Sequence, residues 1–246
     1  MISLSCFSLN KFSSNLYQCN LLNDNKLSSS EVVTDICGNN YNTVVIGAQT
    51  WFAENLRTCK YKNGDNIPNV PLSANWSSLT TGAYTILGNN NSYETLFGKL
   101  YNWQAVAGIW NTASITDINQ RKSFAPDGWR VPGVADFDVL INNLPYGGGT
   151  TYAGVKLRET GNITWGSAGF GSVFYNGSNS TGFTARGAGV RTSNGFGGFR
   201  TNFYIWTYDQ ASSTTANAYR VVSNTASITS VTLLKVTGSS VRLIKI

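Results

Sequence analysis

Two sets of residues could carry chemistry, the carboxylate pair Asp136 and Asp138 and the four cysteines. The 246-residue chain has no histidine, which excludes a Ser-His-Asp triad, a Cys-His pair and a His-ligated zinc or iron site. Asp136 and Asp138 would form an acid/base pair only if they converged, but residues i and i+2 of a helix point to different faces. We interpret them as charges that favour a helix N-terminus. The sequence therefore favours a binding or structural role over catalysis.

Metal and disulfide chemistry is weakly indicated. All the cysteines lie in the first quarter of the chain, at Cys6, Cys19, Cys37 and Cys59. Their spacing matches no metal-site pattern, while one disulfide among them and free buried thiols remain equally open. Asp65, Asn66, Asn69 and residues 89–91 offer oxygen atoms of the kind that bind calcium, but turn chemistry explains the same residues and is preferred. We predict no metal and no cofactor.

Residues 192–217 are the best candidate for a variable binding face. Aromatic and amide side chains on loops are typical of protein and glycan recognition. The candidate ligand-binding residues are Arg200, Asn202, Tyr204, Tyr208, Asp209 and Gln210. Because alternate residues of a strand at 203–208 must face the core, about half of this region is expected to be structural.

The net charge of +6 comes from the last third of the chain. Residues 1–160 carry 11 basic and 11 acidic residues, whereas residues 161–246 carry seven basic residues and one acid, Asp209. Such an excess can attract anionic partners, but these charges are scattered and form no run. We favour arginines that brace loops, and we assign this role also to Arg57, Arg130 and Arg242, with Glu54 as a candidate partner. No nucleic-acid-binding motif is present.

The elements that would position these residues indicate an α+β domain. Charged residues are 12% of the chain, about half the usual share, and the 13% of aromatic residues argues against disorder. We predict strands at 42–46, 51–56, 203–208, 218–222, 231–236 and 240–244, helices at 93–107 and 136–144, and a loop at 62–92. Two short helices followed by a late antiparallel sheet differ from a βαβ pattern. Four tryptophans are predicted to lie in the core, Trp51, Trp103, Trp129 and Trp206.

The beginning of the chain shows no export signal. Residues 1–10 lack a charged region followed by an apolar run, and no stretch approaches the roughly 20 apolar residues of a membrane span. We therefore predict synthesis in the cytoplasm and no membrane insertion. Residues 1–30, rich in Ser, Asn and Leu, are interpreted as a tail or docking arm, and residues 31–246 as one domain.

Six segments in the same order as in a known family carry a resemblance. They are 35–41 (DICGNNY), 46–57 (IGAQTWFAENLR), 98–103 (GKLYNW), 126–132 (PDGWRVP), 180–183 (STGF) and 240–242 (SVR). Together they resemble the Fibrobacter succinogenes major paralogous domain over residues 31–246. They are similar, more distantly, to the formylglycine-generating-enzyme type of C-type lectin-like fold. The resemblance implies a loop-rich α+β domain that serves binding or display in surface proteins of Bacteroidota and their phages.

The chain departs from that family at two positions. The family often has a cysteine just before the Pro-x-Gly-Trp segment and another after the final Val-Arg, where this chain has Ala125 and Leu243. The resemblance implies that these cysteines form one disulfide in exported members. Their joint absence fits a protein that folds in a reducing cytosol. Together with the missing signal, this favours a phage particle released by lysis.

Three functions are therefore weighed. The first is a non-enzymatic phage virion protein, a fibre, tail or capsid decoration, whose N-terminal arm binds other virion proteins and whose lectin-like domain binds a host surface polysaccharide or protein. Virion proteins are commonly symmetric homo-oligomers. The second is a bacterial cell-surface adhesin of Bacteroidota. The third is an enzyme of the formylglycine-generating type, which the resemblance implies would need paired reactive cysteines late in the domain, and no cysteine follows Cys59.

Overall fold

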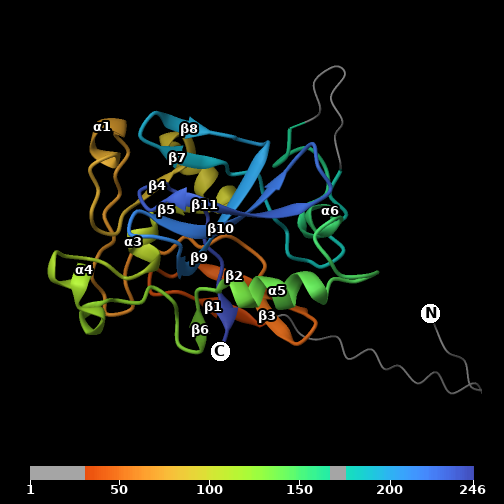
Figure 1. Cartoon of the computed structure of the whole chain (residues 1–246), viewed down its shortest axis with the longest axis horizontal. Coiled ribbons are helices and arrows are strands. Elements are labelled where there is room, and N and C mark those ends of the chain that lie inside the picture. The colour runs from red at the N-terminus through yellow and green to blue at the C-terminus, as the bar shows by residue number, and fades with distance from the viewer. Residues whose placement is uncertain (1–30, 167–175) are drawn as a thin grey trace, which may run out of the picture. The chain divides into compact units, whose positions relative to one another are not determined.

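A computed structural model describes residues 31–166 and 176–246 (Figure 1). The predicted N-terminal arm, with Cys6 and Cys19, lies outside the described residues. The described chain combines short helices with antiparallel sheets, which confirms the α+β class at this level. Within these two stretches, no helix has both the length and the apolar character needed to cross a bilayer.

The beginning and the end of the described chain meet in one five-stranded sheet, in the order β1-β2-β3-β12-β6. Its strands are β1 (Val32–Thr34), β2 (Asn40–Ile46), β3 (Gln49–Phe52), β6 (Trp129–Arg130) and β12 (Ile244–Lys245). Neighbouring strands are antiparallel, and Trp51 lies opposite both Val44 and Ile244. Gly47 turns the chain between β2 and β3 with a φ of 60°, a conformation that glycine adopts without steric cost. The sheet thus joins β12, late in the chain, to the hairpin of β2 and β3.

A second sheet contains the predicted late strands. It consists of β9 (Asn202–Gln210), β10 (Thr215–Val222) and β11 (Ile228–Leu234), in the order β11-β10-β9. Ala218 lies opposite Val231 on one side and Trp206 on the other. From Trp206 to Gln210 the chain advances four residues, while β10 advances only two between their partners. This bulge redirects the end of β9.

The predicted helix at 93–107 is wrong. The structure divides this segment into α2 (Glu94–Phe97), β5 (Lys99–Tyr101) and α3 (Trp103–Val106). Gly98 interrupts the helix with a φ of 75°, and a β-carbon there would lie 2.6 Å from Asn55 Cβ. β5 pairs with β4 (Tyr84–Ile86), a strand inside the segment predicted to be a loop. All residues of β5 are buried, and the apolar side chains of Leu100 and Tyr101 extended the helix-like pattern.

The two predicted strands at 51–56 and 240–244 are shorter than expected. β3 ends at Phe52. The chain after it bonds to residues 241–243, which we call the closing segment, and Leu56 N donates to Val241 O at 2.8 Å. Residue 240 contributes only an isolated parallel bridge to Ile205, so regular pairing is confined to β12. These segments exchange hydrogen bonds with each other in the core instead of extending a sheet.

The predicted helix at 136–144 is confirmed as α5 (Val134–Asn142). Phe137, Leu140 and Ile141 are its buried residues, and their i, i+3, i+4 spacing forms one apolar stripe. α5 lies beside β3 (Figure 1), and the rings of Trp51 and Phe137 meet edge to face at 5.3 Å. α5 therefore covers one side of the first sheet.

Large aromatic residues fill the interior. The four tryptophans predicted to be core are at most 5% exposed, which confirms that prediction. Trp103, Trp129 and Trp206 belong to one apolar cluster, and Trp51 to a second that includes the stripe of α5. The remaining elements are α1 (Ser73–Trp76), η1 (Leu87–Asn89), η2 (Asn91–Tyr93), α4 (Ala113–Thr116), η3 (Ile118–Gln120), α6 (Ala153–Leu157), β7 (Val190–Thr192) and β8 (Gly195–Gly197).

Candidate functional site

The first part of β9 is more structural than exposed. Phe203 and Ile205 are buried, while Asn202 and Tyr204 on the alternate face are half-buried. Tyr204 lies opposite Arg220 of β10. This alternation matches the expectation that about half of the region faces the core.

Arg200 does not join the other predicted residues at the exposed end of β9. Its backbone N donates to Gly187 O at 2.7 Å, and its carbonyl accepts from Gly166 N at 2.7 Å. Its Nη2 donates to Asn162 O. The residue adopts a φ of 59°, so both its backbone and its side chain hold neighbouring loops together.

The exposed end of β9 presents Tyr208 and Gln210 beside the β9–β10 turn, residues 211–214. We call these residues the hairpin tip. Tyr208 is 53% exposed, and Gln210 and the turn are exposed. The turn is ordered by its own hydrogen bonds, because Ser212 Oγ accepts from Thr215 N at 3.0 Å. The tip therefore offers an aromatic ring, an amide and several hydroxyl groups on a defined backbone.

Asp209 points away from the tip and towards α5. Its Oδ2 accepts from Val134 N at 2.6 Å, which satisfies one of the free N–H groups at the beginning of that helix. The contact requires a close approach, because a β-carbon on Gly133 would lie 2.7 Å from Tyr208 Cε1. Asp209 thus positions the bulge, and the ligand-binding role predicted for it receives no geometric support.

Two residues hold the end of β9 and its turn, the buried Trp103 and the half-buried Lys235. Trp103 Nε1 donates to Thr207 O at 3.0 Å, and Lys235 Nζ donates to Gln210 Oε1 and Ser213 O, both at 3.0 Å. The Lys235 ammonium also lies 4.6 Å from the centre of the Trp103 ring, and burial, with a smaller contribution from Arg121, lowers the pKa of Lys235. Sequence analysis missed Lys235, because a lone lysine in a strand-like segment carries no motif.

Arg130 and Asp136 form a bidentate ion pair beside this support. The Arg130 nitrogens Nη1 and Nη2 donate to the two Asp136 oxygens at 2.6 and 2.7 Å, and Gly133 N donates to Asp136 Oδ2 at 2.7 Å. Burial alone would raise the pKa of Asp136, but these hydrogen bonds outweigh it and lower the pKa. The carboxylate therefore caps α5, as predicted, and is unavailable for acid/base catalysis.

Arg242 is fully buried and braces segments that are distant in sequence. Its guanidinium donates to Asn55 Oδ1 at 2.9 Å and to Thr184 O at 2.7 Å, and also to Phe183 O. Burial lowers the pKa of Arg242 to about 9. The bracing role predicted for this arginine is confirmed.

Arg57 binds a backbone carbonyl, as predicted, but the carbonyl belongs to a strand: its Nη2 donates to Asn40 O at 2.7 Å, at the beginning of β2. Glu54, the candidate partner of an arginine, binds a different group: it accepts from Asn42 N at 2.9 Å and from Asn42 Nδ2 at 2.8 Å. These contacts tie the segment after β3 to β2. The same pattern of buried or half-buried polar side chains bonded to backbone recurs at Arg242.

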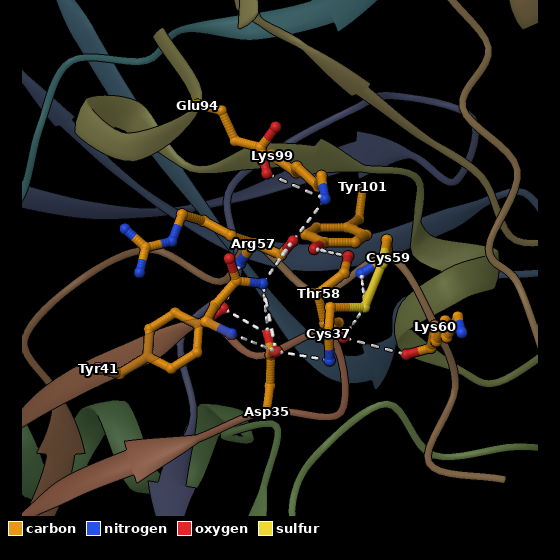
Figure 2. The surroundings of a disulfide bond; sticks show 11 residues. Asp35, Cys37, Tyr41, Arg57, Thr58, Cys59, Lys60, Glu94, Lys99 and Tyr101 are labelled. Carbon is orange, nitrogen blue, oxygen red and sulfur yellow. Dashed lines mark hydrogen bonds and ion pairs between the residues drawn. A yellow bond between two sulfur atoms is a disulfide. The ribbon is translucent and has the colours of Figure 1, made fainter. Parts of the chain in front are cut away.

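A disulfide joins Cys37 and Cys59 beside a buried carboxylate (Figure 2). Asp35, only 5% exposed, accepts from Cys37 N at 2.8 Å and from the Tyr41 hydroxyl at 2.7 Å. Burial, and then the Asp35 charge, raise the pKa of Tyr41. Of the two states left open by the sequence, the structure shows the disulfide, and sequence analysis missed the Asp35 network.

Of the residues considered for calcium, Asp65 is engaged in an ion pair. Asp65 binds Lys122, and hydrogen bonds from Lys122 and Asn63 lower the pKa of Asp65. Within residues 31–166 and 176–246, no group of three or more Cys, Asp and Glu side chains could hold a metal. In residues 89–91, Asn90 Oδ1 accepts from Ser92 N at 3.0 Å, a side-chain-to-backbone bond that is typical of turns.

The model of the Fibrobacter succinogenes major domain matches residues 44–245. This chain belongs to that family. The match includes the hairpin tip, Arg130, Arg242 and the segment that contributes Cys59, whereas Cys37 lies before it. No curated protein and no solved structure matches the chain. Membership of the Fibrobacter succinogenes major domain family does not by itself assign a function, so the function is inferred from the geometry of the domain.

Proposed function

We propose that this Fibrobacter succinogenes major domain protein is a non-enzymatic binding and display protein that recognises a surface polysaccharide or protein. The hairpin tip carries the proposal. Tyr208 and Gln210 are exposed, while the backbone beneath them is held by Trp103, Lys235 and the Asp209–α5 contact. A tip that is ordered before binding loses little conformational entropy on association.

The chemistry of the remaining side chains supports binding over catalysis. Asp136 is committed to Arg130 and the beginning of α5, and Asp209 to the same helix. Cys37 and Cys59 are joined in a disulfide, and no cysteine follows them. A formylglycine-generating activity, which would need late reactive cysteines, is therefore not proposed.

For the fold, we propose the C-type lectin-like type found in formylglycine-generating enzymes. Two observations support it. The first and last described strands share one sheet, and Val241 and Arg242 of the closing segment are fully buried. A solved structure of the chain, compared with lectin-like domains, would test this assignment through the order of the strands.

We propose a phage virion as the carrier, with residues 1–30 binding other virion proteins and the domain displayed as a homo-oligomer. A second candidate, a cell-surface adhesin of Bacteroidota, is favoured by the Cys37–Cys59 disulfide, because surface proteins fold in an oxidising environment. Both carriers place the domain outside the cytosol when it acts.

Density-gradient fractionation separates the two carriers. Particles, envelope and cytosol from a culture that expresses the chain are analysed by peptide mass spectrometry. Sedimentation with particles at a fixed ratio to a capsid protein supports the virion, and recovery in the envelope of phage-free cells supports the adhesin. If the chain is recovered only in the soluble cytosolic fraction, and neither with particles nor in the envelope, display in either form would be overturned.

A further inference from the structure

A second feature, away from the hairpin tip, is an open groove of about 360 Å³ between α6 and the loop that follows α5. Its lining residues are Tyr146, Tyr152, Val155, Lys156, Ser178 and Ser180. The volume falls within the range of about 300–1,000 Å³ that is typical of small-ligand sites. Tyr146 is 94% exposed and Tyr152 is 62% exposed, so two aromatic rings flank the groove with their surfaces in solvent.

The groove is built on ordered backbone. Lys156 Nζ donates to Gly147 O, and Gly149 N donates to Ile141 O of α5 at 3.1 Å. On the opposite side, Ser178 N donates to Val155 O of α6 at 2.8 Å. These bonds fix the loop that carries Tyr146 to α5 and fix Ser178 to α6, so both walls are defined before any ligand binds.

The backbone at Tyr146 adopts a strained conformation that packing of its side chain does not explain. Its φ is 60°, a left-handed conformation that is unfavourable for a bulky residue. The side chain recovers no burial in return, because 94% of its surface is exposed. Such strain in native proteins concentrates at binding and catalytic sites. Here the strained residue is one of those that line the groove.

We propose that this groove binds a saccharide, with a pyranose ring stacked on Tyr146 or Tyr152. The inference rests on the proposed function and specifies where and what the protein binds. The C–H face of a sugar carries slight positive charge, which complements the negative face of an aromatic ring. The hydroxyls of Tyr146, Tyr152 and Ser180 can donate to and accept from the hydroxyls of the sugar, whereas Ser178 Oγ already donates to Val155 O at 3.3 Å. A groove that is largely apolar with a few polar groups suits a ligand of this mixed character.

The alternatives fit the groove less well. A nucleic acid would need cations for its phosphates, but Lys156, the only cation among the groove-lining residues, is already bonded to the Gly147 carbonyl. A protein partner could instead use the exposed hairpin tip, where Tyr208 is 53% exposed. We therefore propose a saccharide as the ligand of the groove, and binding of a protein partner is one outcome of the test.

The test uses the full chain and a printed panel of neutral and uronic-acid oligosaccharides, with affinities of bound members measured by titration calorimetry. At least one of the variants Tyr146→Ala and Tyr152→Ala should weaken binding by about tenfold, the upper end for a single aromatic contact. Tyr152→Phe should retain most of the affinity, because the ring is kept. Ile118→Ala is the matched control, since this apolar residue is 70% exposed elsewhere on the domain, and it should leave binding unchanged.

Each other outcome overturns the groove proposal in a recognisable way. If binding is lost with Tyr208→Ala but kept in both groove variants, the sugar site is the hairpin tip, and the proposed function stands. If the panel is not bound while cells are bound through a protease-sensitive receptor, the ligand is a protein and the proposed function again stands. If the folded chain binds neither sugars nor cells, the groove proposal and the proposed function both fail. Thermal melting of each variant confirms that it is folded.

Discussion

Removing the Cys37–Cys59 disulfide with the double substitution Cys37→Ala and Cys59→Ala should lower the free energy of unfolding by about 3 kcal/mol. The two cysteines are separated by 22 residues. In the chain-entropy model, cross-linking a loop of that length reduces the entropy of the unfolded chain by an amount worth roughly 3.4 kcal/mol at 25 °C. The Asp35 network remains in the variant, because Asp35 accepts from the backbone N of residue 37 and from the Tyr41 hydroxyl. The loss should therefore appear as reduced stability of a correctly folded domain.

Urea unfolding followed by tryptophan fluorescence measures this loss, with and without a reducing agent. The matched control is Cys6→Ala with Cys19→Ala, which keeps the disulfide and should unfold at the parent midpoint. Reducing agent should destabilise the control and leave the Cys37→Ala/Cys59→Ala variant unchanged. The reasoning is refuted if the unreduced, denatured control shows two free thiols, or if the disulfide-free variant is as stable as the parent.

Three further predictions concern the supports of the fold. Arg242→Met should cost about 3 kcal/mol or more in urea unfolding, because the buried carbonyls and amide that it binds lose their donors; a cost below 1 kcal/mol would contradict the bracing role. The pKa of Asp136 is lowered in the folded state, so its stabilisation is present above the unfolded pKa and is lost as pH falls through the folded pKa. Asp136→Asn should therefore flatten the fall in the urea midpoint between about pH 5 and pH 2.5, and an unchanged slope would count against the Arg130 pair. Gly98→Ala should lower the melting temperature, because its φ of 75° and the 2.6 Å approach to Asn55 Cβ both oppose a side chain; an unaltered melting temperature would show that the local backbone can relax.

The sequence predicts the elements whose pattern is local and regular. The apolar stripe at Phe137, Leu140 and Ile141 predicts α5, and alternation predicts β9 and β10. The segment 93–107 shows where this reasoning fails. The apolar residues of this segment have a helix-like spacing, although Gly98 interrupts the helix and β5 is a buried strand. The pairing of β5 with β4, which lies outside the segment, decides the structure, and the local sequence pattern does not reveal it.

The candidate binding residues were predictable in type more than in place. Aromatic and amide residues near β9 do form an exposed tip at Tyr208 and Gln210. Asp209, in the bulge of β9, instead accepts from the backbone N of Val134. Arg200 adopts a left-handed conformation and holds neighbouring loops together. Lys235 supports the tip through contacts that depend on the folded chain. The groove at Tyr146 could not be foreseen, because it requires α6 and the loop after α5 to meet.

Binding of the fluorescently labelled chain to intact Bacteroidota cells tests the central claim most directly. The account predicts saturable binding, competed by the unlabelled chain and weakened by Tyr208→Ala with Gln210→Ala at the hairpin tip, while Ile118→Ala binds as the parent does. Absence of saturable binding by the folded chain across a panel of strains would contradict a display function.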